Sequence, residues 1–154
     1  MVLTALAVGL LAAGVAVAAE PDAYAGTNAA ARGVADPTRA WRNYALNCQG
    51  CHRSDGAGDP DSAPALAGHI AVFTRMEGGR AYLGRVPGVA TSPLADDELA
   101  ELLNWVLWRF DPEHMSAGFP PYGADEIGRL RRSPLRTEAA TTRAALLARS
   151  DARP

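Results

Sequence analysis

The stretch Cys48-Gln49-Gly50-Cys51-His52 decides how the rest of the sequence is interpreted, because it holds the only two cysteines of the 154-residue chain. Two cysteines separated by two residues lie too close together to cross-link distant parts of a fold. A histidine follows the second thiol directly. This spacing indicates local chemistry that uses two thiols and one imidazole.

Four kinds of site use cysteines in this way. A dithiol redox motif needs a β-α-β setting, and the chain has no strand-like alternation beyond a few residues. A zinc site needs four ligands, and the only further candidates, His69 and His114, lack a second paired motif. A plain disulfide leaves His52 unexplained. Covalent haem attachment uses all three side chains: Cys48 and Cys51 reach the two vinyl groups of one haem, and His52 binds the iron. The sequence therefore predicts one covalent haem c.

The motif follows a predicted helix over 37–47, in which Asp36 is the N-cap and Pro37 takes the first helical position. The clearest helix covers 95–110, where apolar residues recur at helical spacing and acidic residues at the start favour the helix dipole. Pro112 prevents this helix from continuing.

Shorter helices are expected elsewhere, and there is no internal repeat. They cover 69–77, 81–86, 124–132 and 137–149, with a stop at Gly78-Gly79, a turn at Pro87-Gly88 and an extended stretch over 119–122. The predicted fold class is all-α.

The ends of the chain differ from its centre. Residues 1–19 carry no charge and end in small residues, which predicts a signal peptide. No Lys or Arg follows Met1, so an uncleaved membrane anchor is the alternative. Residues 20–36, rich in Ala, Gly, Asp and Pro, are expected to be a linker. The formal net charge is −2, and the fifteen basic residues are all Arg. No large basic field exists to bind nucleic acid.

Three further features carry a family resemblance. An aromatic residue, Tyr44, stands four positions before the first cysteine, Pro64-Ala65-Leu66 follows the motif, and Trp105 lies in the last strong helix. With the motif, they make residues 38–110 resemble the class I c-type cytochromes. The resemblance implies that the first and last helices cross, with Ala40 where the family customarily has glycine.

The resemblance also implies a domain plan and a cofactor environment. A small cytochrome c-like haem domain is expected over 37–111, followed by a C-terminal extension over 112–154. In this family the proline carbonyl accepts a hydrogen bond from the second ring nitrogen of the ligating histidine and fixes its tautomer. This role carries over to Pro64 and His52, and Leu66 joins Pro64 among the residues expected to bind the cofactor.

One part of the family pattern is missing. Class I cytochromes usually have a methionine shortly before the last helix as the second axial ligand, but residues 87–94 contain neither Met nor His. The remaining candidates are Met76, His69, His114 and Met115. We assign Met76 as the candidate sixth ligand, because its segment is expected on the distal side. An open sixth position is the alternative.

The extension differs in charge from the rest of the chain. Residues 125–154 carry 7 Arg against 4 acidic residues, whereas 1–124 carry 8 Arg against 13 acidic residues. We expect the extension to wrap around the haem or the last helix. A docking surface for a redox partner is the alternative, and its candidate residues are Arg129, Arg131, Arg132 and Arg136.

The resemblance implies single-electron transfer outside the cytoplasmic membrane and no enzymatic activity, apart from weak peroxidase-like activity if the sixth position is open. The expected donor is a periplasmic dehydrogenase, and the acceptor is an oxidase or another cytochrome. Membrane contact is expected only if residues 1–19 are retained. Two alternatives stay open: a haem protein that binds or senses a small ligand, and a cytochrome subunit of a larger dehydrogenase complex.

Overall fold

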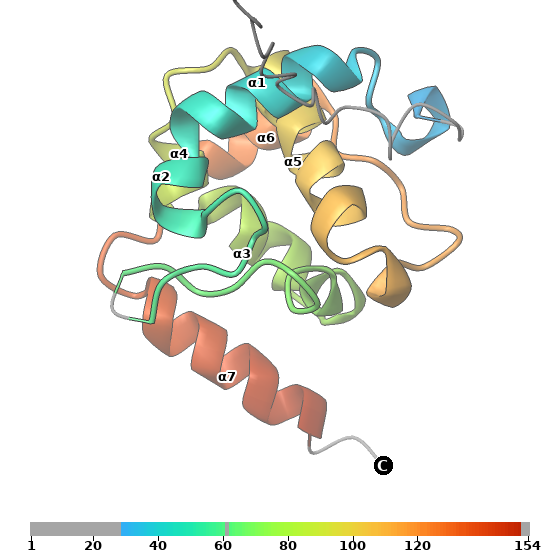
Figure 1. Ribbon diagram of the computed structural model, residues 1–154. Helices are drawn as coiled ribbons and strands as arrows, with labels where there is room; N and C mark the ends of the chain where they lie inside the picture. Colours follow the sequence, from blue (N-terminus) through green and yellow to red (C-terminus); the bar gives the residue numbers. More distant parts are fainter. Residues whose placement is uncertain (1–28, 61, 152–154) are drawn as a thin grey trace, which may run out of the picture.

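The computed structural model describes residues 29–60 and 62–151, and these form a helical domain (Figure 1). The predicted signal peptide, 1–19, lies outside the described residues. The helices, in chain order, are η2 (Ala30–Arg32), α1 (Pro37–Asn47), α2 (Gln49–His52), η3 (Ala71–Arg75), α3 (Gly79–Arg85), α4 (Pro87–Ala90), α5 (Asp96–Phe110), η4 (Pro112–His114), α6 (Ala124–Arg131) and α7 (Ala139–Asp151). Within the described residues there is no strand, which confirms the all-α class.

The helix before the cysteine motif begins and ends as predicted. The side chain of Asp36 accepts a hydrogen bond of 2.9 Å from the backbone N–H of Arg39, and Pro37 occupies the first turn of α1. An N-cap of this kind satisfies one of the backbone donors that the first turn leaves unpaired. α5 starts at Asp96, one residue later than expected.

α1 and α5 cross at a point where both helices present small or aromatic side chains. Ala40 is fully buried, and the ring of Tyr44 lies 5.5 Å from the ring of Trp105 and 5.0 Å from that of Phe110, measured between centroids. A small residue at position 40 lets the two backbones approach closely, and tilted aromatic pairs stabilise the crossing. The crossing implied by the resemblance is therefore present.

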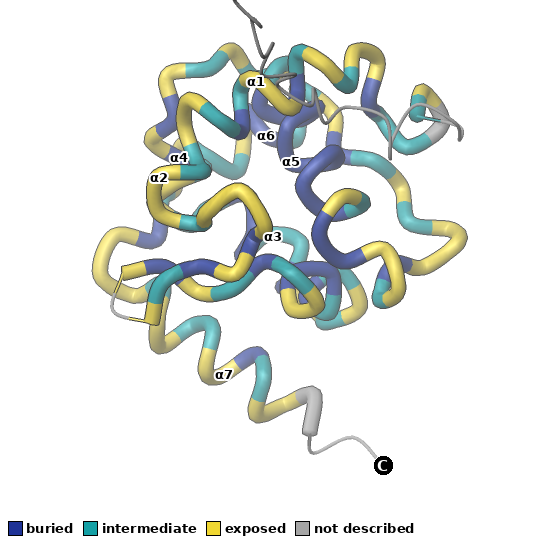
Figure 2. The backbone as a smooth tube through the Cα atoms, in the orientation of Figure 1, coloured by how far each residue is buried: buried dark blue, intermediate teal, exposed yellow. Residues whose placement is uncertain are grey.

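α5 is the central helix of the fold, and Figure 2 shows most of it as buried. α6, which follows α5 in the chain, packs against both α5 and α3. A Cβ added to Gly128 would lie 2.5 Å from the Asp96 carboxylate, and one added to Gly84 would lie 2.5 Å from Leu130. Both glycines let backbones approach more closely than a larger residue would allow. α6 therefore covers part of α5.

The shorter elements differ from their predictions, α6 and α7 only at their ends, which give 124–131 instead of 124–132 and 139–151 instead of 137–149. The helix expected over 69–77 is the short 3-10 helix η3, and α3 begins at Gly79 rather than residue 81. A Cβ at Gly79 would lie 2.0 Å from the Phe73 carbonyl oxygen. This close approach leaves no room for a helix that runs to residue 77 and then ends at Gly78-Gly79. The turn expected at Pro87-Gly88 is the single-turn helix α4, because proline is well suited to a first helical turn.

α7 lies at the edge of the molecule, across the domain from α1 (Figure 1). Leu146 of α7 is buried, with 2% of its surface exposed. Much of the rest of the helix is exposed (Figure 2). The Arg143 guanidinium lies 5.7 Å from the centre of the Phe73 ring. None of the described helices is both long enough and apolar enough to cross a membrane.

Candidate haem site

The two cysteines and the histidine lie on one helical turn. Cys48 stands between α1 and α2, and its N–H donates to the Tyr44 carbonyl at 2.9 Å. The Cys48 carbonyl then accepts hydrogen bonds from the N–H groups of Cys51, at 3.2 Å, and His52, at 2.9 Å. This turn brings the three side chains into one short region of the surface. Both thiols are free; Cys48 is half-buried and Cys51 is exposed.

The environment of Cys48 does not suit dithiol redox chemistry. Burial and, to a smaller extent, the negative charge of Cys51 together raise the pKa of the Cys48 thiol to about 11. Reactive dithiol motifs instead lower the pKa of one thiol, so that a thiolate exists at neutral pH. In the described residues no three His, Cys, Asp or Glu side chains are grouped to hold a metal ion, so the zinc alternative finds no ligand set there.

His52 is oriented by the carbonyl that the family resemblance indicated. Its Nδ1 lies 3.0 Å from the Pro64 carbonyl oxygen. Burial lowers the pKa of His52, against the opposing effect of this hydrogen bond. A neutral imidazole that donates through Nδ1–H keeps the Nε2 lone pair available, and this is the form that binds iron. The two free thiols and this imidazole therefore fit a covalently bound haem.

The loop after the motif brings Pro64 back to His52. Arg53 turns the chain with a φ of 63°, and its carbonyl accepts a 2.6 Å hydrogen bond from the Tyr44 hydroxyl. The Gly56 carbonyl accepts hydrogen bonds from the N–H groups of Leu66, at 2.8 Å, and Ala67, at 3.1 Å. These contacts fold the loop back on itself.

Position 56 requires glycine because of both its backbone conformation and its close neighbours. Its φ is +74°, and an added Cβ would lie 2.6 Å from the ring of Phe110. The loop is therefore held against the last turn of α5. Leu66 is 9% exposed and belongs to the hydrophobic core, so it lies beside Pro64 at the boundary between site and core.

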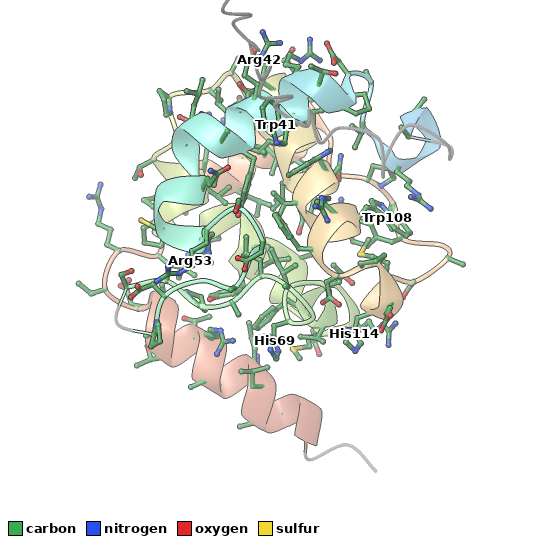
Figure 3. The ribbon with its side chains drawn as sticks, in the orientation of Figure 1. Trp41, Arg42, Arg53, His69, Trp108 and His114 are labelled. Carbon is green, nitrogen blue, oxygen red and sulfur yellow. The ribbon has the colours of Figure 1, made fainter. Side chains whose placement is uncertain are left out.

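The candidates for the sixth ligand differ in their surroundings. Met76 follows η3, is half-buried and packs against the core, whereas Met115 is 8% exposed and part of the core. His114 Nδ1 lies 2.5 Å from the buried carboxylate of Asp111, and His69 is exposed. Figure 3 shows both histidines above α7, below and to the right of Arg53, the residue after His52.

Sequence reasoning missed the contacts of Arg131. It appeared only as a member of a basic surface group, but its side chain is 19% exposed and its guanidinium binds the chain just before α5. Arg129, Arg132 and Arg136 are exposed as expected. Most partners of Arg131 are backbone carbonyls, which leave no signature in a sequence.

Comparison with known proteins identifies the family. No protein-family model matches the chain. It is similar to two proteins named cytochrome c-552 from Thermus thermophilus, one of them from a specified strain, and is 35% identical to each over 106 residues. The match takes up 57% of this chain and covers 81% of the first relative and 72% of the second. The chain therefore belongs to the class I monohaem c-type cytochromes, which carry covalently bound haem c and act as electron carriers rather than enzymes.

Proposed function

We propose that this protein is an exported cytochrome that carries single electrons from a periplasmic dehydrogenase to an oxidase or another cytochrome. The observation that carries the proposal is the hydrogen bond of 3.0 Å between His52 Nδ1 and the Pro64 carbonyl, one helical turn from two free thiols. Cys48 and Cys51 would hold the haem through thioether bonds, and His52 Nε2 would bind its iron. Pro64 and Leu66 complete this side of the cofactor site.

When bound at this site, haem would supply one-electron chemistry at its iron. The protein residues fix the environment of that chemistry. Pro64 holds the His52 ring in one orientation, and Tyr44 holds the carbonyl of Arg53, the residue that reverses the chain beyond His52. A site that moves little between the two oxidation states suits rapid electron transfer.

We assign Met76 as the sixth ligand, since it is half-buried beside the core and a thioether in this position raises the reduction potential. The test is the optical spectrum of the holoprotein, oxidised and reduced, for the wild type, Met76→Ala and the control Met115→Ala. A low-spin spectrum lost only in Met76→Ala supports the assignment. A low-spin spectrum that survives Met76→Ala would refute it and direct attention to Met115, His69 or His114.

A second candidate function is the binding of a small ligand at an open sixth position. It is favoured by the absence of Met and His from residues 87–94, the stretch before α5. A high-spin spectrum that shifts when carbon monoxide is added would establish it. The electron-carrier proposal would then give way to ligand binding or sensing.

Haem attachment is tested independently of the sixth ligand. The chain is produced with a cytochrome c maturation system, and its denatured mass is compared for the wild type and the double variant Cys48→Ala/Cys51→Ala. We expect the wild type to be heavier by one haem and the variant to lack this increase. A wild-type chain without the added mass would refute covalent attachment.

We further propose that residues 1–19 are a cleaved leader and that 20–36 link it to the haem domain, 37–111. Residues 112–154 are the extension. Sequencing the N-terminus of the exported protein tests the leader: an intact residue 1 would mean a retained anchor.

Partner choice is tested by mixing the oxidised protein with a candidate dehydrogenase and its substrate. If the oxidised protein is reduced to the same extent when the dehydrogenase is left out, that dehydrogenase is rejected as the donor.

A further inference from the structure

Arg53, the residue after His52, has a backbone conformation that is unusual for arginine. Its φ is 63° and its ψ is 167°. This combination belongs almost only to glycine, and another residue keeps it only where the surrounding structure holds it there. Within the described residues, Arg53 is the one non-glycine residue with a positive φ. A glycine would adopt this backbone without strain, so the presence of arginine calls for a contribution from its side chain.

The backbone of Arg53 is held by contacts that do not involve its side chain. Its N–H donates to the Gln49 carbonyl at 2.7 Å, and its carbonyl accepts from the Tyr44 hydroxyl at 2.6 Å. These two hydrogen bonds fix the direction in which the chain leaves the Cys48–His52 motif. Any residue at position 53 can make them, so they do not explain the arginine.

The side chain of Arg53 holds two successive residues of the following loop. Its Nε donates to the Gly58 carbonyl at 2.6 Å, and a second guanidinium nitrogen pairs with the Asp59 carboxylate at 2.9 Å. The planar fork of arginine can reach both acceptors at once. The two side chains of the ion pair are 57% and 33% exposed, so the pair by itself adds little to overall stability. What it supplies is the placement of Gly58 and Asp59 relative to the motif.

Those two residues lie directly against the chain that carries the Pro64 carbonyl. A Cβ added to Gly58 would lie 2.7 Å from the carbonyl carbon of Pro64 and 2.6 Å from the carbonyl oxygen of Ala63. The N–H of Asp59 donates to the Ala63 carbonyl at 2.8 Å, and the N–H of Ala63 donates back to the Asp59 carbonyl at 2.9 Å. This bridge joins two parts of the loop to each other, and Arg53 joins the bridge to the motif.

The chain of contacts returns to His52. The Pro64 carbonyl oxygen lies 3.0 Å from His52 Nδ1, and the Gly58 N–H donates to the His52 carbonyl at 3.1 Å. The hydrogen bond at Nδ1 sets the orientation of the imidazole and raises its basicity as a ligand. The position of the Pro64 carbonyl, which Gly58 supports, therefore decides how well His52 is prepared to bind iron.

We propose that Arg53 is a positioning residue for the His52 imidazole. By holding Gly58 and Asp59, its side chain keeps the Pro64 carbonyl at hydrogen-bond distance from Nδ1, and the strained backbone is retained for this purpose. The inference rests on the proposed function, because it requires iron at His52 Nε2. It goes beyond that function by assigning the orientation of the ligand to a residue outside the cofactor-binding set.

The test compares variants of the holoprotein by two measurements. One is the rate at which the His52 Nδ1 proton exchanges with deuterium, followed by NMR of the reduced protein. The other is the urea concentration at the midpoint of unfolding. The variants Arg53→Gly and Arg53→Ala both lose the side-chain contacts, but only glycine also relieves the strain. Arg42→Ala is the matched control, since it removes an exposed arginine of α1 that Figure 3 shows apart from Arg53.

For Arg53→Gly and Arg53→Ala we expect the Nδ1 proton to exchange about tenfold faster, the change that corresponds to losing one charge-assisted hydrogen bond. The contact between Gly58 and the His52 carbonyl remains, so the carbonyl of Pro64 is loosened rather than released. Arg53→Gly should nevertheless unfold at a higher urea concentration than Arg53→Ala. Arg53→Lys keeps the charge but loses the fork, so its exchange rate should lie between those of wild type and Arg53→Ala. Arg42→Ala should exchange at the wild-type rate.

A wild-type exchange rate in Arg53→Gly would overturn the proposal, because the backbone alone would then position the loop. An equal acceleration in Arg42→Ala would also overturn it, since the effect would be that of any lost charge. So would exchange that simply follows the unfolding midpoint, with Arg53→Gly restored toward wild type. Arg53→Lys serves as the test variant if the other two do not fold. A wild-type chain without haem is recognised by its spectrum and would refute the proposed function itself.

Discussion

The side-chain amide of Asn104 binds both backbone groups of Tyr122. Its Nδ2 donates to the Tyr122 carbonyl at 3.0 Å, and its Oδ1 accepts from the Tyr122 N–H at 2.8 Å. The same Nδ2 also reaches the Gly33 carbonyl at 3.2 Å. Asn104 is 1% exposed, so one buried amide joins α5 to the chain before α1 and to the extension.

Replacing Asn104 with alanine should therefore destabilise the fold strongly. The change leaves the N–H and carbonyl of Tyr122 buried without their partner, and we expect the free energy of unfolding to fall by about 3 kcal/mol. Chemical denaturation measures this change. Asn43→Ala is the matched control, because the Asn43 side-chain NH₂ is buried without a partner among the described residues. Removing it should have little effect, and an equal loss in both variants would contradict this reasoning.

Gly56→Ala should damage the loop that brings Pro64 to His52. Residue 56 has a φ of +74°, and the new methyl group would lie 2.6 Å from the Phe110 ring. Strained backbone and overpacking together should reduce the free energy of unfolding by about 3 kcal/mol. Among the described residues nothing lies near the position a Cβ would take at Gly118, so Gly118→Ala should be almost neutral. Similar melting temperatures for the two variants would show that the loop adapts.

Tyr44→Phe removes the hydroxyl that donates to the Arg53 carbonyl at 2.6 Å. The carbonyl then loses a partner in a partly buried site, and the free energy of unfolding should fall by about 1 kcal/mol. Tyr82→Phe is the control, because the Tyr82 hydroxyl has no hydrogen-bond partner among the described residues. Urea unfolding of both variants tests the difference. If Tyr82→Phe lowers the free energy of unfolding by as much, the hydrogen bond of Tyr44 does not explain the effect.

Stability should decline in alkaline solution because of buried tyrosines. Burial raises the pKa of Tyr122 above its ordinary value of 10.0, and the negative charge of Glu126 adds to this while Arg80 opposes it. Above pH 10 the unfolded chain loses the phenolic proton but the folded chain keeps it, so the unfolded state is favoured. The free energy of unfolding should fall as the pH rises above 10, and less steeply in Tyr122→Phe. An identical slope in that variant would exclude Tyr122 as a cause.

The strongest helices could be predicted because their signals are local. Asp36 and Pro37 mark the start of α1 within a few residues, and the apolar spacing of α5 repeats along its whole length. The contact between His52 and Pro64 joins residues on either side of a loop. No periodicity indicates such a contact, and only the family resemblance suggested it.

The contacts of Arg131 could not be predicted. Arg131 lies 35 to 41 residues from the groups that it binds, and three of these are backbone carbonyls that any residue type would supply. The sequence shows only a basic helix, which is more often a solvated surface. The single-turn helix α4 was not predicted for a related reason, since Pro87-Gly88 is equally typical of a turn.

The limited packing of α7 makes it a suitable handle for immobilising the protein. Leu146 is the anchoring side chain, while Ala144 and Ala148 are exposed on a helix across the domain from α1. A thiol introduced by Ala148→Cys could be coupled to a gold electrode without changing a side chain of the core. Every molecule would then be attached by the same helix, and electron exchange could be recorded for one defined orientation of the haem domain.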